Sequence, residues 1–204
     1  MNVEIITATA NPMDVISLAA GVCFGKDNIS HDRVRTCFKK NHLSVFEHVS
    51  ATFKIEGVSR ACMAQITRHR HASFGVESQR YCKYDFADPD WYVVPEAFEQ
   101  PAFVGDLTLK SWYQTQMEND AKAYRNALER GVKPEDARYL LPNAAKTTLV
   151  VTMNARELFH VFDMRLDHAA QWEVRNTANV MNNALMDWGG QWVDLLNMYH
   201  GVQE

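Results

Sequence analysis

Residues 68–81 read Arg-His-Arg-His-Ala-Ser-Phe-Gly-Val-Glu-Ser-Gln-Arg-Tyr and concentrate positive charge in a chain that is acidic as a whole. The 204 residues carry a formal net charge of −4, yet three arginines fall within this stretch. A guanidinium stays charged and offers a rigid fork of N–H donors, which suits an anionic planar ligand such as a phosphate or a nucleobase edge. Basic runs also occur on solvated surfaces, and composition alone leaves that alternative open.

The order of the residues helps to decide between a ligand-binding segment and a solvated surface. Arg68-His69-Arg70 is followed by seven residues, then Ser78, and then Arg80-Tyr81. This pattern resembles the signature of the flavin-dependent thymidylate synthases. Further segments resemble the family in the same order along the chain: His42-Leu43-Ser44-Val45-Phe46-Glu47-His48, Gln65, Ala137-Arg138-Tyr139-Leu140-Leu141-Pro142, Asn154-Ala155-Arg156, His160, Arg165 and His168-Ala169-Ala170-Gln171-Trp172-Glu173.

One dipeptide inside the signature departs from the family. Gly75-Val76 stands where the family usually carries Asn-Glu, so an amide and a carboxylate are replaced by no side chain and an apolar one. Glu77 is not a simple substitute, because adjacent side chains of an extended segment point to opposite sides. The preferred pyrimidine, the product and the effect of this change therefore stay open.

The resemblance implies a sheet flanked by helices and a homotetramer whose active sites are shared between subunits. It implies FAD-dependent reductive methylation of dUMP to dTMP, with methylenetetrahydrofolate as carbon donor and NADPH as reductant. It assigns FAD binding to Ser44, Arg68, His69, Arg70, Asn154, Arg156 and His160. It assigns dUMP binding to Gln65, Arg68, Ser78, Gln79, Arg80, Arg138 and Arg165, and it places His42 near the flavin and the folate.

Arg165 is the predicted catalytic residue. A fixed cation near N3 of the uracil and its adjacent carbonyl would stabilise the uracil anion, which pushes electron density onto C5, the carbon that must attack. Arginine suits this role because it remains protonated. Taken singly, Arg138 and Arg156 could be salt-bridged surface residues and His160 a core histidine; the ordered motifs favour the ligand roles.

Length and composition favour one domain spanning residues 1–204, since typical domains contain about 100 to 200 residues. The net charge and a pI near 6.1 argue against a general nucleic-acid binder. The four cysteines form no CxxC pair, and no apolar run approaches the length of a membrane span. We therefore expect a cytoplasmic protein with reduced thiols that is not bound to a membrane.

Patterns of β-branched residues, caps, prolines and glycines predict the secondary structure. Strands are expected at Val3–Thr9, at Val49–Ile55 with an end at Gly57, and at Lys146–Met153. Helices are expected at Pro12–Ala20, Asp32–Lys40, from a Ser59 cap through Gln65 and Arg68, Leu107–Arg130, from Pro134, from an Asn154 cap, and from Ala169 with a break at Gly189-Gly190. The region Asp85–Pro101 is expected to be a loop. Because strands and helices do not alternate regularly, the predicted class is α+β.

Three alternatives compete with the methylating enzyme. A related flavin and folate enzyme could leave a hydroxymethyl group on the pyrimidine. A nucleic-acid binding module could use the basic stretch with Phe74 and Tyr81 as stacking groups. Glu157 and His160 also have the Glu-x-x-His spacing of helical di-iron sites, but such sites need two of these motifs and further carboxylates, so no metal is expected.

Overall fold

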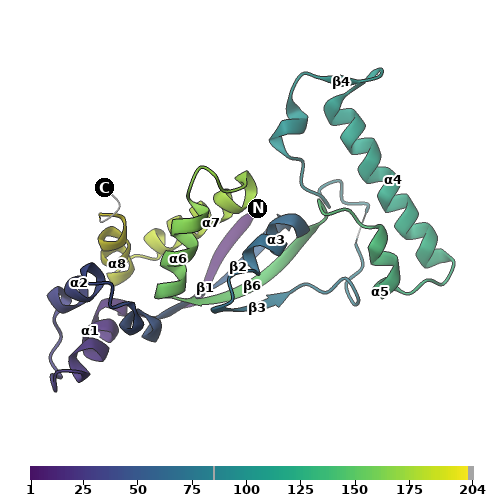
Figure 1. Ribbon diagram of the computed structural model, residues 1–204. Helices are drawn as coiled ribbons and strands as arrows, with labels where there is room; N and C mark the ends of the chain where they lie inside the picture. The colour runs from purple at the N-terminus through teal and green to yellow at the C-terminus, as the bar shows by residue number, and fades with distance from the viewer. Residues whose placement is uncertain (85, 202–204) are drawn as a thin grey trace. The chain divides into compact units, whose positions relative to one another are not determined.

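The computed structural model describes residues 1–84 and 86–201, and Asp85, the first residue of the predicted loop region, lies outside the described residues (Figure 1). The chain divides into two compact units. The first unit comprises Met1–Ile55, Gln65–Gly75 and Leu149–Glu204, and the second comprises Glu56–Ala64 and Val76–Thr148. The prediction of a single domain over residues 1–204 stays a prediction.

The elements mix strands and helices without regular alternation, which confirms the α+β class. The strands are β1 (Asn2–Ala8), β2 (Ser50–Ser59), β3 (Ala72–Val76), β4 (Phe103–Val104), β5 (Leu107–Thr108) and β6 (Lys146–Asn154). The α-helices are α1 (Pro12–Val22), α2 (His31–Lys39), α3 (Arg60–Ile66), α4 (Leu109–Glu129), α5 (Pro134–Ala137), α6 (Ala155–Arg165), α7 (Trp172–Trp188) and α8 (Gln191–His200). Short 3-10 helices are η1 (Leu43–His48), η2 (Glu96–Glu99) and η3 (Arg138–Leu140).

A four-stranded sheet in the order β1-β2-β6-β3 is the frame of the fold. In β2, Ala51, Phe53 and Ile55 are at most 1% exposed and share one face, as the alternating pattern predicts. The prediction that Gly57 ends this strand was wrong. Gly57 has a φ of +74°, which its lack of a Cβ permits, and the strand continues to Ser59.

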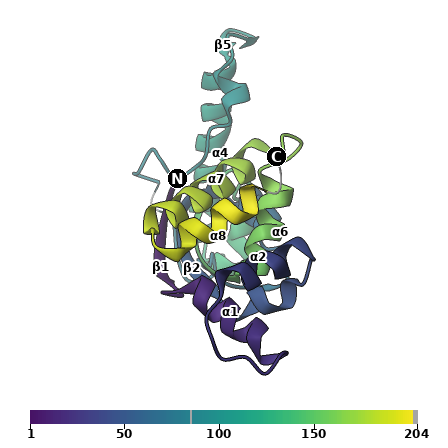
Figure 2. The same cartoon turned by 90° about the vertical axis from the view of Figure 1, so that its left-hand side faces the viewer.

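The helices of the first unit pack beside its strands and against one another. Helix α7 contacts β1, α6 and α8, and α1 contacts α2 and α8 (Figure 2). The predicted break holds, since Gly189 and Gly190 both have positive φ and separate α7 from α8. The indole of Trp192 in α8 donates a hydrogen bond of 2.9 Å to the carbonyl of Thr9, just after β1.

Two further predictions about helices were wrong in detail. Arg68 lies beyond the end of α3, so it does not share a helical face with Gln65; instead its N–H donates to the Gln65 carbonyl at 3.4 Å in a turn. The helix expected from Ala169 begins at Trp172, because the side chain of Gln171 caps it by accepting from the N–H groups of Glu173 and Val174.

The second unit has a core of its own. Helix α4 begins after its Thr108 cap, and β4 pairs with β5 in a small antiparallel hairpin that the sequence patterns did not reveal. Aromatic and small side chains fill the core: Trp91, Tyr113, Met117, Ala121 and Ala145. Figure 1 shows α4, which is drawn in teal, with β4 and α5 beside it. These elements belong to the segment between β3 and β6.

Two glycines provide a matched test of the backbone. Gly57→Ala forces a Cβ into a left-handed conformation and should destabilise the protein by about 1–2 kcal/mol. Gly75→Ala meets nothing within 4 Å and needs no positive φ, so it should be neutral or stabilising by about 0.5–1 kcal/mol. Urea denaturation of both variants measures the difference, and equal effects would contradict the assignment of Gly57.

Candidate functional site

Helix α6 is the centre of the candidate site because its first turn and its last residue both carry predicted site residues. Asn154 caps it, as predicted: its side-chain oxygen accepts from the N–H of Glu157 at 2.9 Å. Arg156 and His160 lie four residues apart and are exposed on the same side of the helix, whereas Glu157 is only 5% exposed. Arg165 is the last residue of the helix.

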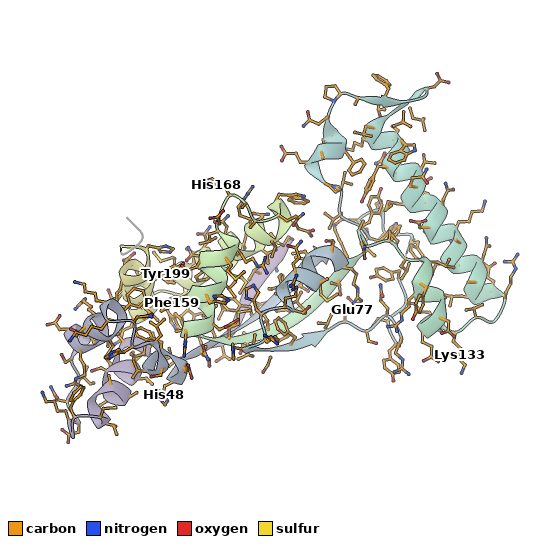
Figure 3. All side chains as sticks on the ribbon, viewed as in Figure 1. His48, Glu77, Lys133, Phe159, His168 and Tyr199 are labelled. Carbon is orange, nitrogen blue, oxygen red and sulfur yellow. The ribbon has the colours of Figure 1, made fainter. Side chains whose placement is uncertain are left out.

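Stacking of aromatic side chains holds α6 against α8. The rings of Phe159 and Tyr199 are nearly parallel, at 2°, with their centroids 4.8 Å apart (Figure 3). The Tyr199 hydroxyl donates a hydrogen bond of 2.6 Å to Asp163, one turn further along α6. Buried contacts of this kind restrict the rotation of a helix, so the exposed side of α6 is held in a defined orientation.

A cleft of about 610 Å³ lies along this side of α6. Three predicted FAD residues, Asn154, Arg156 and His160, line it together. The other lining residues are Leu43, Glu47, His71, Glu157, Phe159 and Asp163. A volume of this size lies in the range of small-molecule and cofactor sites, about 300–1,000 Å³.

A second hollow of about 370 Å³ shares Leu43 and Arg156 with this cleft. Two residues predicted near the flavin, His42 and Ser44, line it. The Arg156 guanidinium lines both hollows and forms an ion pair of 2.6 Å with Glu47. The structure therefore brings five predicted residues of the first unit, counting Asn154 and His160, to one connected region.

The Arg-His-Arg segment follows α3 and places its side chains on different sides. Arg68 and Arg70 are exposed, whereas His69 is only 4% exposed. The backbone of the segment forms a turn at the end of α3, in which the His69 N–H donates to the Ile66 carbonyl at 3.1 Å. His69 is therefore a buried contact at this point of the fold, and His71 is the histidine of this segment that lines the cleft.

Arg165 is held by this buried histidine. Its Nε donates a hydrogen bond of 2.9 Å to Nε2 of His69, and its Nη2 donates to the Gln65 carbonyl at 3.4 Å. On the other side of the ring, Nδ1 of His69 lies 3.4 Å from Oε1 of Glu157. Burial, together with the charge of Arg165 and the neighbouring His160, lowers the pKa of His69 from 6.5 to about 4. The imidazole is therefore neutral at pH 7.

Among the predicted dUMP residues of the second unit, Arg80 and Arg138 contact Glu135. Arg80 donates to its carboxylate at 3.1 Å through Nε and 3.0 Å through Nη2, and Arg138 donates to its backbone carbonyl at 2.9 Å. Ser78 accepts from the N–H of Arg80 at 3.2 Å, and Gln79 donates to the Tyr84 hydroxyl at 3.2 Å. Arg80 and Arg138 are thus neighbours within this unit.

The Gly75-Val76 position lies in the extended strand β3. A Cβ on Gly75 would meet nothing within 4 Å. No other group therefore fills the space beside Gly75 where the family carries an amide side chain. Glu77 is used by the backbone: its N–H donates to the Thr148 carbonyl at 2.9 Å, and its carboxylate accepts from the Thr148 N–H at 3.3 Å. The Glu77 carboxylate is therefore engaged by the backbone of β6.

Four titratable residues that line the cleft were not predicted from the sequence: Glu47, His71, Glu157 and Asp163. Glu47 and His71 belong to motif segments that resemble the family, residues 42–48 and 68–81. Their place in these segments could have indicated that they line the site. Glu157 was considered only for a metal. Within residues 1–84 and 86–201, no cluster of three or more potential metal ligands forms.

Comparison with known proteins identifies the family of the chain. The family model described as "Thymidylate synthase complementing protein" matches residues 4–189. A flavin-dependent thymidylate synthase of Haloarcula marismortui is 34% identical, with 92% of each protein covered. Its counterpart in Geobacter sulfurreducens is 38% identical, with 87% of this chain and 79% of that protein covered.

The chain belongs to the flavin-dependent thymidylate synthases. A solved structure of a Helicobacter pylori flavin-dependent thymidylate synthase, complexed with FAD and dUMP, has the same fold, with a TM-score of 0.68 and 26% identity. The structural match covers 91% of this chain and 94% of the Helicobacter pylori chain. The expected family and fold are thereby confirmed, and the nucleic-acid module is not favoured.

The low pKa of His69 predicts how stability depends on pH. Because the folded protein disfavours the protonated ring, stability is fully present above the ordinary value of 6.5 and decreases as the pH falls from 6.5 to about 4. A difference of this size corresponds to a loss of up to about 3 kcal/mol. Urea denaturation across this range measures it, and His69→Gln should remove this part of the dependence. An unchanged pH dependence in the variant would contradict the assignment.

Proposed function

We propose that this enzyme methylates dUMP to dTMP, with FAD held along α6, methylenetetrahydrofolate as carbon donor and NADPH as reductant. The observation that carries the proposal is the convergence of Asn154, Arg156 and His160 on one cleft, in a chain of this family. These three side chains offer an amide, a guanidinium and an imidazole.

The cleft fits an extended anionic cofactor with a planar ring. Arg156 offers a charged fork for a pyrophosphate, and Asn154 and His160 offer hydrogen-bonding groups for ring edges. The adjoining hollow, with His42 and Ser44, extends the available length. Exposed Arg68 and Arg70 add positive charge to the same unit. When bound and reduced by NADPH, the flavin would supply the two electrons that convert the transferred carbon into a methyl group.

Arg165 is the proposed activating residue. Its guanidinium stays protonated, and next to N3 of the uracil it would stabilise the anion that makes C5 nucleophilic. The hydrogen bond to His69 uses Nε, which leaves donors of the guanidinium for the substrate. Arg80 and Arg138, two neighbouring cations in the second unit, are the proposed partners of the substrate phosphate, with Ser78 and Gln79 beside them.

We also propose a homotetramer with shared active sites that works in the cytoplasm. Exposed apolar side chains such as Phe24, Tyr139 and Trp188 support contacts with further subunits, because large apolar groups gain stability when a partner covers them. Cys23, Cys37 and Cys82 are thiols, which is consistent with a reducing compartment. No helix among residues 1–84 and 86–201 is long and apolar enough to cross a membrane.

The visible spectrum of the protein with FAD tests joint binding. A flavin band that follows the protein through gel filtration and shifts when dUMP is added would place both ligands in one site. A protein that retains no flavin would contradict the proposal. Gly75→Asn, for which the backbone leaves space, serves as the companion variant and should retain FAD at least as well.

Arg165→Ala should lower the rate of dTMP formation by at least about 100-fold, the range found when one preorganised donor is removed from a charge-stabilising site. FAD should remain bound, because Arg165 lies outside the 610 Å³ cleft. Arg35→Ala, at an exposed ion pair of α2, is the control and should keep full activity. Full activity of Arg165→Ala would overturn the assigned role.

A further inference from the structure

Buried Glu157 takes no part in the roles assigned so far, although it lies beside the group that holds Arg165. It is 5% exposed, it belongs to the first turn of α6, and its Oε1 lies 3.4 Å from Nδ1 of His69. A carboxylate removed from water is costly unless a partner compensates it. Its position on the far side of the imidazole from Arg165 therefore calls for an explanation.

The hydrogen bond between Arg165 and His69 fixes the protonation of the imidazole. Nε of an arginine is always a donor, so Nε2 of His69 must be the acceptor and carry no proton. The single proton of the neutral ring is then on Nδ1, which faces the Glu157 carboxylate. If the proton moved to Nε2, two donors would face each other and Arg165 would lose this contact.

The groups recorded around His69 show which carboxylate lies beside Nδ1. The ring of His160, also on α6, meets it edge to face at 5.7 Å between centroids. From α7, the residues that line the small hollow with His69 and Arg165 are Val174, Thr177, Ala178 and Met181. The hydroxyl of Thr177 donates to the Glu173 carbonyl within α7. Glu157 is thus the carboxylate that faces the ring.

We propose that Glu157 is a positioning residue for Arg165: its carboxylate holds His69 in the Nδ1–H tautomer, so that Nε2 accepts from Arg165 and fixes the guanidinium. This inference rests on the proposed function, in which Arg165 contacts the uracil. Groups that orient a ligand through a second group commonly contribute about 10- to 100-fold. The carboxylate also balances the charge of Arg165 across the neutral ring.

Glu157→Gln and Glu157→Ala test the proposal in the full-length enzyme. Glutamine keeps an oxygen that can accept from Nδ1–H, so its kcat should fall less than that of the alanine variant, for which we expect a loss of about 10- to 100-fold. KM for dUMP should change much less than kcat, because the guanidinium is present but poorly oriented. Unchanged kcat in both variants would overturn the proposal.

Glu173→Gln is the matched control. Glu173 is also 5% exposed and also lies in the first turn of its helix, α7, so it reports the loss of a buried acid at a helix N-terminus. This variant should lose stability and keep its kcat. An equal loss of kcat in Glu173→Gln and Glu157→Gln would show that the effect is structural and would overturn the positioning role.

The ¹⁵N NMR signals of the imidazole rings give a measurement that does not depend on activity. The signal of His69, assigned with the His69→Gln variant, should show a proton on Nδ1 in the wild type and a shift toward Nε2 in Glu157→Ala. A wild-type ring protonated on Nε2 would overturn the proposal. If the wild type formed no dTMP but showed the Nδ1–H tautomer, the proposed function would fail while the buried arrangement stood.

Discussion

The hydrogen bond between Arg165 and His69 connects the two parts of the first unit that carry the function. It joins the end of α6 to the Arg-His-Arg segment, which lies 96 residues earlier in the chain. The bond requires a neutral imidazole, and the neutral state follows mainly from burial, which together with the charge of Arg165 and the neighbouring His160 lowers the pKa of His69 to about 4. Packing of the first unit therefore sets the protonation that holds the proposed catalytic arginine.

Three of the arginines proposed to bind a ligand, Arg80, Arg156 and Arg165, are associated with a glutamate in their own unit, but the environments differ. Arg156 pairs with Glu47 and Arg80 pairs with Glu135, and all four side chains are at least 37% exposed. Exposed pairs contribute only about 0–1 kcal/mol, so an anionic ligand can replace the carboxylate at little cost. The contact runs from half-buried Arg165 through buried His69 to buried Glu157, and it is suited to holding a side chain in place.

Local sequence signals predicted the parts of the site that depend on one element. The cap at Asn154 and the helical spacing of Arg156 and His160 require only α6 itself, and both predictions were correct. The tryptophans near the C-terminus differ in burial, since Trp192 is 1% exposed whereas Trp172 is 37% and Trp188 47% exposed. Periodicity identifies an apolar face but does not show which part of it a neighbouring element covers.

Features that depend on distant segments could not be predicted. The burial of His69 depends on contacts with α6, and nothing in the basic composition of residues 68–81 distinguishes it from exposed Arg68 and Arg70. The strand β3 depends on its neighbour β6, which is separated from it by about 70 residues of chain. The role of Glu157 emerges only when Arg165 and His69 are seen together.

Identification of the product tests the central claim most directly. The purified enzyme is incubated with FAD, dUMP, methylenetetrahydrofolate and NADPH, and the nucleotides are separated and identified by mass spectrometry. We expect dTMP, formed only when all of these components are present. Hydroxymethyl-dUMP as the sole product, or unchanged dUMP in an enzyme that has bound FAD, would contradict the claim.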